Sequence, residues 1–423
     1  MANEVTLTVT QGKSNMPVTN QPQLAYVLME ILPTEVMATV QMPVNFSLVL
    51  DTSGSMDGEK IERLKDAVEY VIDLLSPEDT ISIIDFSSSS HVMVKSQRAT
   101  SASDKAKLKA AVRKLNAGGG TEIAPALRDG LDEVKKYRSQ NSIDRVILLT
   151  DGQTSNEKAC LKMADSAGKD SIPVIGLGIG SDWNEDLLRD IGQRSGGEAD
   201  YIAQPHEIGQ YFQGVVQSMQ ASVVQNAVLT LHLVSGVEIR KIWRVLPAIS
   251  DLGYSPISGH GVIVPLGELE KTQGQALMAE LLLPSRQAGT YRIAQAEVAY
   301  DVPMLNLTQE KARGDVVMSF THDPVLSQQA NPRVMNIVEK VTAFKLQTRA
   351  LSEMDAGNIA GATQKLRAAA TILLNQGEAD LAKTVRLEAD QLEKTNKMSS
   401  EGKKTIQFKG GKTVRLSDLS SDS

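Results

Sequence analysis

The sequence predicts an α/β domain with a central, mostly parallel sheet, inserted in or followed by an antiparallel β-sandwich and completed by a C-terminal helical domain. Three changes of pattern along the 423 residues support this prediction. Residues 3–42 read as strands, and residues 44–220 alternate apolar strands with amphipathic helices. Strands return over 222–321, and helical periodicity follows over 330–396. A chain of this length exceeds one ordinary core, so two or three domains are expected.

The N-terminal segment is too short to be stable alone. The apolar residues of "VTLTVT" alternate with threonines, and "QLAYVLMEI" and "VMATVQM" follow without a helical period. Two or three strands do not form an independent sheet. We therefore expect residues 1–42 to join residues 222–321 in one β-sandwich, with residues 43–221 inserted between them.

The α/β region alternates near-continuous apolar strands with helices, which is typical of a sheet covered on both faces. The expected strands cover 44–51, 80–86, 91–95, 145–151, 172–179 and 200–203, and the expected helices cover 58–75, 103–115, 122–138, 156–169, 184–194 and 206–219. The second and third strands are too close in sequence for a crossover helix, so this pair is expected to be antiparallel.

The region 330–396 is expected to form three helices, with Pro332 at the first helical position. The last two, 358–375 and 378–395, resemble one tetratricopeptide unit, but a lone unit cannot bury its face, which favours a docked helical domain. Residues 397–423 read as a polar, basic tail with six Lys/Arg against three acids. Its "KTIQF" and "KTVRL" segments each suit a short strand. We expect a solvated tail, with strand pairing at a sheet edge or serine phosphorylation as the alternatives.

Composition excludes several classes of function. The net charge of −7 argues against a nucleic-acid binder that relies on phosphate contacts. No run of about 18 apolar residues exists, so no membrane span is predicted. The segment "MANEVTLTVTQGK" lacks the basic and apolar regions of a secretory signal, so we expect a cytoplasmic location. Cys160 is the single cysteine, which excludes an internal disulfide and a multi-cysteine metal site.

Catalytic and nucleotide-binding motifs are missing from the sequence. The stretch "GLGIGSDW" (176–183) has glycines after a strand but lacks the third glycine of GxGxxG. The chain contains no GxxxxGK[ST] and no GxSxG, and its five histidines are dispersed without an HExxH pattern. We therefore predict a protein that is not an enzyme. Trp183 suits either a contact near a site edge or the packing of a helix.

Oxygen-bearing side chains follow the apolar strand at 44–51. In "VNFSLVLDTSGSMD", Asp51, Ser53 and Ser55 occupy alternating positions. Asp, Ser and Thr are preferred helix N-caps, so this stretch alone is equally compatible with a cap for the following helix. A cap and a metal site are the two competing interpretations.

Two other stretches favour the metal site. "NAGGGTEIAPAL" places Thr121 after three glycines and before a helix, and "RVILLTDGQTSN" places Asp151 at the end of another apolar strand. Ligands bind at the carboxyl edge of such sheets, so we expect Asp51, Ser53, Ser55, Thr121 and Asp151 to converge there. These five side chains offer only oxygen, with two carboxylates to balance a divalent charge. Such a set suits Mg²⁺, Mn²⁺ or Ca²⁺ and leaves a position for an acidic ligand.

The set "DTSGS", "GGGT" and "TDG" resembles the metal-ion-dependent adhesion site (MIDAS) of von Willebrand factor A domains, and the likeness covers the whole α/β region. The resemblance implies a Rossmann-like fold with Ser53, Ser55 and Thr121 as direct metal ligands. It implies that Asp51 and Asp151 bind the metal directly or through water. It also implies an interaction module whose cation, Mg²⁺ in the first place and Ca²⁺ or Mn²⁺ otherwise, binds an exposed Asp or Glu of a protein partner.

The chain as a whole resembles intracellular bacterial proteins that carry this domain. A second functional hypothesis is regulatory. The same site would then serve a Ca²⁺- or Mg²⁺-responsive adaptor or sensor, or an accessory subunit of an ATPase or chelatase machine. Cation preference separates the two hypotheses, because sensors bind Ca²⁺ selectively at micromolar concentrations.

Overall fold

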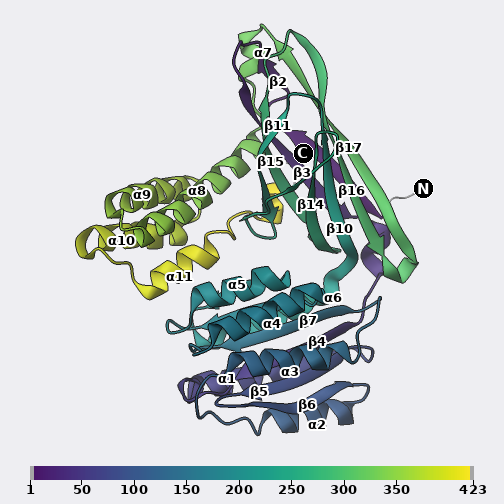
Figure 1. Ribbon diagram of the computed structural model, residues 1–423, viewed down its shortest axis with the longest axis vertical. Helices are drawn as coiled ribbons and strands as arrows, with labels where there is room; N and C mark the ends of the chain where they lie inside the picture. Colours follow the sequence, from purple (N-terminus) through teal and green to yellow (C-terminus); the bar gives the residue numbers. More distant parts are fainter. Residues whose placement is uncertain (1–3, 420–423) are drawn as a thin grey trace. The chain divides into compact units, whose positions relative to one another are not determined.

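The computed structural model describes residues 4–419, and residues 1–3 and 420–423, which include the last three serines of the predicted tail, lie outside the description. The chain divides into two compact units, Gln41–Ala221 and Met1–Val40 together with Ser222–Ser423 (Figure 1). An α/β domain with a mostly parallel sheet, two further sheets and a C-terminal helical domain are all present, so the predicted fold class is confirmed. The limits predicted for the separate domains stay predictions.

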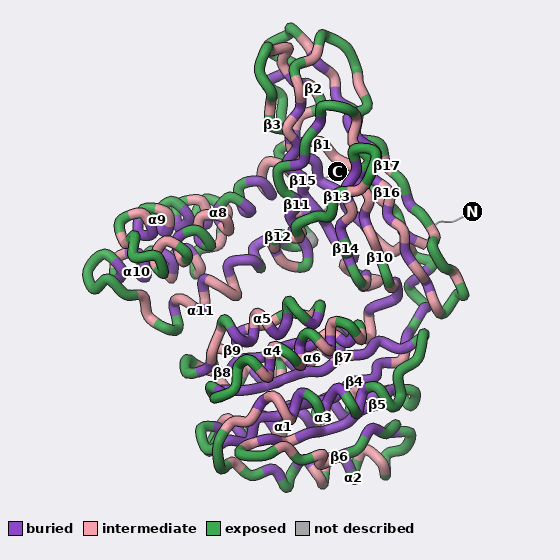
Figure 2. The backbone as a smooth tube through the Cα atoms, in the orientation of Figure 1, coloured by how far each residue is buried: buried purple, intermediate pink, exposed green. Residues whose placement is uncertain are grey.

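The first unit is built on a six-stranded sheet in the order β6-β5-β4-β7-β8-β9. Its strands are β4 (Val44–Asp51), β5 (Thr80–Phe86), β6 (Ser90–Arg98), β7 (Ile143–Thr150), β8 (Val174–Ile179) and β9 (Glu198–Ile202). All neighbours are parallel except β5 and β6, which are antiparallel as their short connection predicts. Figure 2 shows these central strands as mostly buried, and every residue of β4 is buried. An apolar strand without alternation is what a sheet covered on both faces requires.

Six helices cover the two faces of this sheet. They are α1 (Glu59–Leu74), α2 (Ala102–Val112), α3 (Ile123–Lys135), α4 (Glu157–Lys169), α5 (Glu185–Ser195) and α6 (Ile208–Ala221), with short 3-10 turns η2 (Gly54–Met56) and η3 (Pro205–Glu207). Helices α1, α2 and α6 share a core with Phe46, Leu48 and Leu50 of β4. On the opposite face, α3 approaches so closely that a Cβ at Gly130 would lie 2.7 Å from Val49 Cγ2.

The second unit contains two sheets that enclose one core. A five-stranded sheet has the order β1-β3-β15-β11-β12, and a six-stranded sheet has the order β13-β14-β10-β16-β17-β2. Their strands are β1 (Val5–Gln11), β2 (Asn15–Pro17), β3 (Gln23–Pro33), β10 (Ser222–Leu233), β11 (Glu238–Leu246), β12 (Ser250–Asp251), β13 (Ser255–Ile257), β14 (Gly261–Glu270), β15 (Gln275–Leu283), β16 (Gly289–Val302) and β17 (Leu307–Thr321), with 3-10 turns η1 (Glu35–Thr39) and η4 (Pro303–Leu305). Strand β3 pairs with β15, so N-terminal strands share a sheet with strands beyond residue 222.

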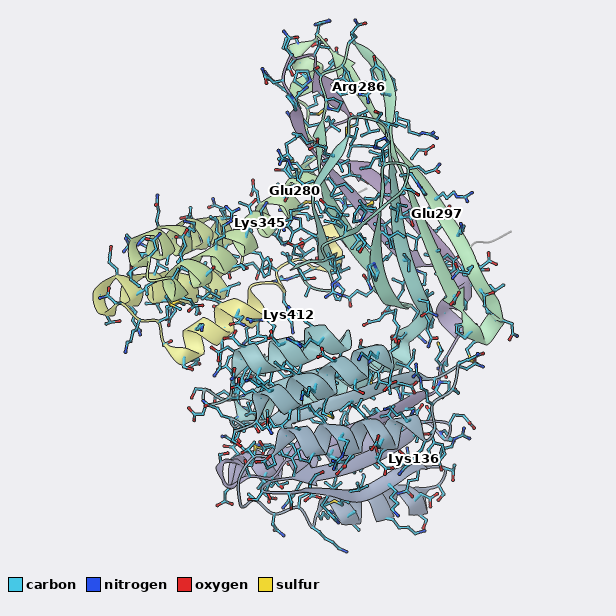
Figure 3. The ribbon with its side chains drawn as sticks, viewed as in Figure 1. Lys136, Glu280, Arg286, Glu297, Lys345 and Lys412 are labelled. Atoms are coloured by element: carbon cyan, nitrogen blue, oxygen red, sulfur yellow. The ribbon has the colours of Figure 1, made fainter. Side chains whose placement is uncertain are left out.

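The C-terminal helices are α7 (Pro324–Gln328), α8 (Pro332–Asp355), α9 (Ile359–Asn375), α10 (Ala379–Thr395), α11 (Ser400–Lys409) and α12 (Leu416–Leu419). Of these helices, α8 packs on the outer face of the five-stranded sheet, and α9 and α10 form a separate helical core with it. Ile337 of α8 lies in one buried cluster with Trp243 and Met278 of the sheet. The buried carboxylate of Glu280 accepts hydrogen bonds at 2.8 Å from Trp243 Nε1 and Lys345 Nζ (Figure 3). The residues 4–419 include no helix with the length and apolar character of a membrane span.

The prediction of a solvated tail with two short strands is wrong for the residues up to 419. "KTIQF" lies in helix α11, which Ser399 caps by accepting a hydrogen bond from Gly402 N, and "KTVRL" contains no strand. Val414 is buried against α8, and Lys340 Nζ donates to Thr413 O at 2.9 Å. This packing could not be predicted from the sequence, because the segment has only isolated apolar side chains, and these contact residues that are distant in the sequence.

Candidate metal site

The site lies at the carboxyl edge of the parallel sheet, where β4 and β7 end side by side. Leu50 pairs with Leu149, so the next residues of the two strands, Asp51 and Thr150, also lie beside each other, and Asp151 follows directly. Parallel pairing therefore brings two carboxylates that are 100 residues apart to one place. Both carboxylates are almost completely buried, with 0% of Asp51 and 1% of Asp151 exposed.

Hydrogen bonds hold the buried carboxylate of Asp51 in place. Ser53 N donates to Asp51 Oδ1 at 2.8 Å, and the hydroxyl of Thr150 donates to Asp51 Oδ2 at 2.5 Å. Burial raises the pKa of Asp51 above its ordinary value, the two donors lower it in part, and the nearby charge of Asp151 raises it further. An ionised Asp51 is therefore costly in this environment unless a positive charge lies near it.

The serine hydroxyls form a chain that ends on Asp151. Ser55 Oγ donates to Asp151 Oδ1 at 2.6 Å and lies 3.1 Å from Ser53 Oγ. Because Ser55 has a single hydroxyl hydrogen, Ser53 is the donor in the second bond. Thr121 completes the group from the third loop, since a Cβ at Gly152 would lie 3.1 Å from Thr121 Oγ1. The structure thus gathers all five side chains that the sequence singled out.

The helix-cap interpretation of "DTSGS" is wrong. The N-cap residue of α1 is Gly58, which has no side chain to cap with. Ser53 precedes the 3-10 turn η2 but makes no side-chain cap hydrogen bond. The hydroxyls of Ser53 and Ser55 instead form the series of hydrogen bonds that ends on Asp151. The oxygens at the end of β4 therefore belong to the site and not to the start of the helix.

Backbone hydrogen bonds join the glycine-rich loop to the loop after β4. Gly118 N donates to Thr52 O at 2.8 Å, and Gly54 N donates to Gly119 O at 3.2 Å. Gly119 has a φ of +85°, a conformation that side chains rarely adopt, which explains a glycine at this position. These contacts fix the approach of Thr121 to the two strand ends.

Two further residues at this edge, Thr150 and Lys60, were not predicted from the sequence. Thr150 is fully buried, and its hydroxyl both donates to Asp51 and accepts from Gly152 N at 3.2 Å. Lys60 on α1 forms an ion pair with Asp151 Oδ2, and its ammonium also donates to Ser55 O at 3.2 Å. A polar residue in the last position of an apolar strand could have pointed to Thr150. The pairing of Lys60 with Asp151 spans 91 residues and leaves no local pattern.

Trp183 packs within the domain and does not serve as a surface contact. The side chain is 1% exposed, and its Nε1 donates to Gly180 O at 2.8 Å. A Cβ at Gly178 would lie 2.1 Å from the indole ring. The second of the two interpretations of Trp183 therefore holds, and Gly178 makes room for the ring.

The donor chemistry of the gathered side chains fits a hard divalent cation. Two carboxylates and three hydroxyls supply oxygen alone, which Mg²⁺, Ca²⁺ and Mn²⁺ prefer over softer ions. A cationic group, the ammonium of Lys60, already lies against Asp151, so the edge accommodates positive charge. Among residues 4–419, no group of three or more His, Cys, Asp or Glu is arranged to hold a metal ion, and the candidate site itself has two carboxylates beside its three hydroxyls.

Two family models match the chain. The von Willebrand factor type A domain matches residues 45–213, and the Sll0103-like, C-terminal α-helical domain matches residues 332–415. Uncharacterized protein sll0103 of Synechocystis is 29% identical over 340 residues, which cover 78% of each protein. Inter-alpha-trypsin inhibitor heavy chain H3 of Rattus norvegicus is 23% identical over 66% of this chain, and the match spans only 34% of that heavy chain.

A solved structure shares the fold of the whole chain. The von Willebrand factor type A protein from Catenulispora acidiphila superposes with a TM-score of 0.79, covering 98% of this chain and 97% of the other at 20% identity. This likeness extends over the α/β domain, the two additional sheets and the helices. Together, the family match, the shared fold and the strand order identify the α/β unit of this chain as a von Willebrand factor type A domain.

Proposed function

We propose that the von Willebrand factor A domain binds a divalent cation through Asp51, Ser53, Ser55, Thr121 and Asp151, and that this cation binds an acidic side chain of a partner protein. The observation that carries the proposal is the gathering of two buried carboxylates and three hydroxyls from three loops at one sheet edge. Domains of this family commonly mediate metal-dependent protein–protein interactions, which supports the same reading.

The charge of the site supports a divalent ion. The two buried carboxylates lie near each other, and the ammonium of Lys60 lies beside one of them, so the three groups together carry a net negative charge. A divalent cation compensates that charge beside two carboxylates that are almost completely buried. When bound, the ion supplies a Lewis-acidic position for a carboxylate oxygen of the partner. Mg²⁺ is the first choice for these ligands, with Ca²⁺ and Mn²⁺ as alternatives.

We infer a binding role and not a catalytic one. Asp51 and Asp151 are both committed to the proposed ion, so neither is left to act as a general base. The regulatory alternative uses the same residues and differs in cation preference. Micromolar, Ca²⁺-selective binding favours a sensor, whereas Mg²⁺-supported capture of a partner favours the interaction module.

Calorimetric titration of the full chain with Mg²⁺, Mn²⁺ and Ca²⁺ tests the metal site. One saturable site is expected, and Thr121→Ala should weaken it about tenfold or more. Thr154→Val is the matched control, because the Thr154 hydroxyl lies in the loop after Asp151 yet has no hydrogen-bond partner in the described part of the chain. A folded wild-type protein that binds none of the three ions contradicts the proposal.

Affinity capture tests the second half of the proposal. The immobilised chain is exposed to an extract of its own cells in Mg²⁺ or in chelator, with the Thr121→Ala variant alongside. A partner retained only by the wild-type chain in Mg²⁺ is the expected result. Retention that ignores both the chelator and the substitution would show that the partner does not bind through the cation.

A further inference from the structure

We propose that Lys60 is a built-in positive charge that weakens cation binding to the ligand-free site and makes the loaded site select an acidic ligand. The inference rests on the proposed function, since it concerns the same five ligands. Lys60 is not a ligand, because its positive charge is opposite to that of the ligand carboxylates. The consequence of the inference is that cation and acidic ligand bind better together than either binds alone.

The position of Lys60 is unusual for a helix surface lysine. It is the second residue of α1, and the N-terminal turn of a helix disfavours positive charge. Its ammonium nevertheless pairs with Asp151, whose side chain is 0% exposed, while the side chain of Lys60 is 26% exposed. A second contact to Ser55 O, at 3.2 Å, directs the ammonium into the loop that carries two of the proposed ligands.

Lys65 on the same helix provides the contrast. Its ammonium pairs with Glu62 at 2.8 Å, but 66% of the Glu62 side chain is exposed, so water screens this pair. Lys60 pairs with a carboxylate that is shielded from water, where charges interact more strongly. Only the first of these two lysines can therefore influence an ion at the sheet edge substantially.

The charge balance of the site gives the direction of the effect. Asp51 and Asp151 would neutralise a divalent ion completely if no other charge were near. With the ammonium of Lys60 beside Asp151, the site attracts a divalent ion less and the loaded site carries one net positive charge. A carboxylate from a partner restores neutrality. The same lysine thus disfavours the ion alone and favours the ion together with an acidic ligand.

Titration with Mn²⁺ tests the inference on the full chain, by calorimetry and by loss of the free-ion electron paramagnetic resonance signal. Lys60→Met should bind Mn²⁺ about tenfold more tightly than wild type, because one repulsive charge is removed. Lys60→Arg keeps the charge and should stay within about threefold of wild type. Lys65→Met is the matched control and should not change the affinity. Lys60→Gln replaces Lys60→Met if the apolar side chain impairs folding.

A second series repeats the titration in sodium acetate and in sodium chloride of equal ionic strength, with acetate as the probe for a partner carboxylate. Acetate should tighten Mn²⁺ binding by wild type more than by Lys60→Met. The coupling part of the inference is overturned if the two proteins respond equally.

The outcomes separate the inference from the proposed function. If wild type binds Mn²⁺ and Lys60→Met binds it equally or more weakly, Lys60 does not oppose the ion and the inference is overturned, while the metal site stands. If neither wild type nor any Lys60 variant binds Mn²⁺, the proposed function itself fails. Measurable binding by wild type together with about tenfold tighter binding by Lys60→Met supports both.

Discussion

The hydroxyl of Thr150 offers the sharpest test of how the candidate site is held together. Thr150 is fully buried at the end of β7, where it donates to Asp51 Oδ2 at 2.5 Å and accepts from Gly152 N at 3.2 Å. Thr150→Val keeps the shape of the side chain and removes both hydrogen bonds. The buried carboxylate of Asp51 then retains the donor Ser53 N.

The expected loss follows from the two bonds. A hydrogen bond to a charged group contributes about 1.5–3 kcal/mol to stability, and a neutral one contributes about 0.5–1.5 kcal/mol. The pKa of Asp51 is already raised by burial, so losing a donor pushes it higher and protonation relieves part of the cost. We expect Thr150→Val to lower the free energy of unfolding of the α/β unit by about 2–3 kcal/mol.

Urea unfolding followed by tryptophan fluorescence measures this loss in the correct unit. The chain has two tryptophans, and Trp183 lies in the α/β unit whereas Trp243 lies in the other. A Trp243→Phe background therefore leaves an emission signal that reports only on the α/β unit, which avoids assuming one transition for the whole chain. Thr154→Val is again the control, because its hydroxyl is buried without a partner among residues 4–419.

A midpoint for Thr150→Val that matches the background within error would refute this reasoning, since it would mean that the buried Asp51 does not depend on its Thr150 donor. Equal losses for Thr150→Val and Thr154→Val would also refute it. In that case, any hydroxyl at the edge would be equivalent and the hydrogen bond to Asp51 would have no special weight.

Three further predictions concern packing away from the ligands. Burial raises the pKa of the Cys160 thiol to about 12. At pH 8, the native protein should therefore react with a disulfide reagent about a thousandfold more slowly than the unfolded protein, as measured by the released chromophore. Fast labelling of the native protein would contradict this. Gly178→Ala, which forces a Cβ against Trp183, should cost about 1–3 kcal/mol in the same urea assay. Asp418→Ala, which leaves buried Lys340 without its carboxylate partner, should cost about 1–3 kcal/mol by Trp243 fluorescence, and adding Lys340→Met should recover part of it.

The sequence predicts the α/β domain well because its signals are local and strong. The predicted strand 44–51 coincides with β4, and the predicted helix 58–75 coincides with α1 to within one residue at each end. Both have a clear apolar pattern. The strand is mostly apolar, as a sheet covered on both faces requires, and the helix has apolar residues every three to four positions. The antiparallel pairing of β5 with β6 follows equally directly, from the length of one connection.

The C-terminal segment shows where such reasoning stops. Residues 397–419 have few apolar side chains, and their burial depends on partners on other elements. Lys404 is 1% exposed and Lys340 is 4% exposed, although lysine is ordinarily a surface residue. No apolar periodicity in the sequence predicts that a lysine is buried. The tail was therefore expected to be solvated, and its helix α11 was missed.

In the candidate site, too, the residues that follow a local sequence pattern could be predicted and the others could not. Its five predicted ligands could be found because each ends a recognisable local pattern, an apolar strand or a glycine run, and parallel topology brings the patterns together. That they bind a metal stays a prediction. Lys60 could not be found, because an ion pair across 91 residues depends on the exact path of the chain between them. Local patterns thus locate candidate ligands, whereas a charge that lies beside them, such as that of Lys60, appears only in three dimensions.

Substitutions of Thr150 and Lys60 test separately how hydrogen bonding and how charge contribute at this edge of the sheet. Both contact a buried carboxylate and so stabilise the site before any ion binds, but only Lys60 carries a charge. Removing the Thr150 hydroxyl should therefore lower stability, whereas removing the Lys60 ammonium should tighten cation binding. The loops themselves are already joined by backbone hydrogen bonds, so ion binding does not have to assemble them. If the proposed cation binds here, we expect its affinity to depend chiefly on the balance of one ammonium against two carboxylates, which a partner's acidic side chain would complete.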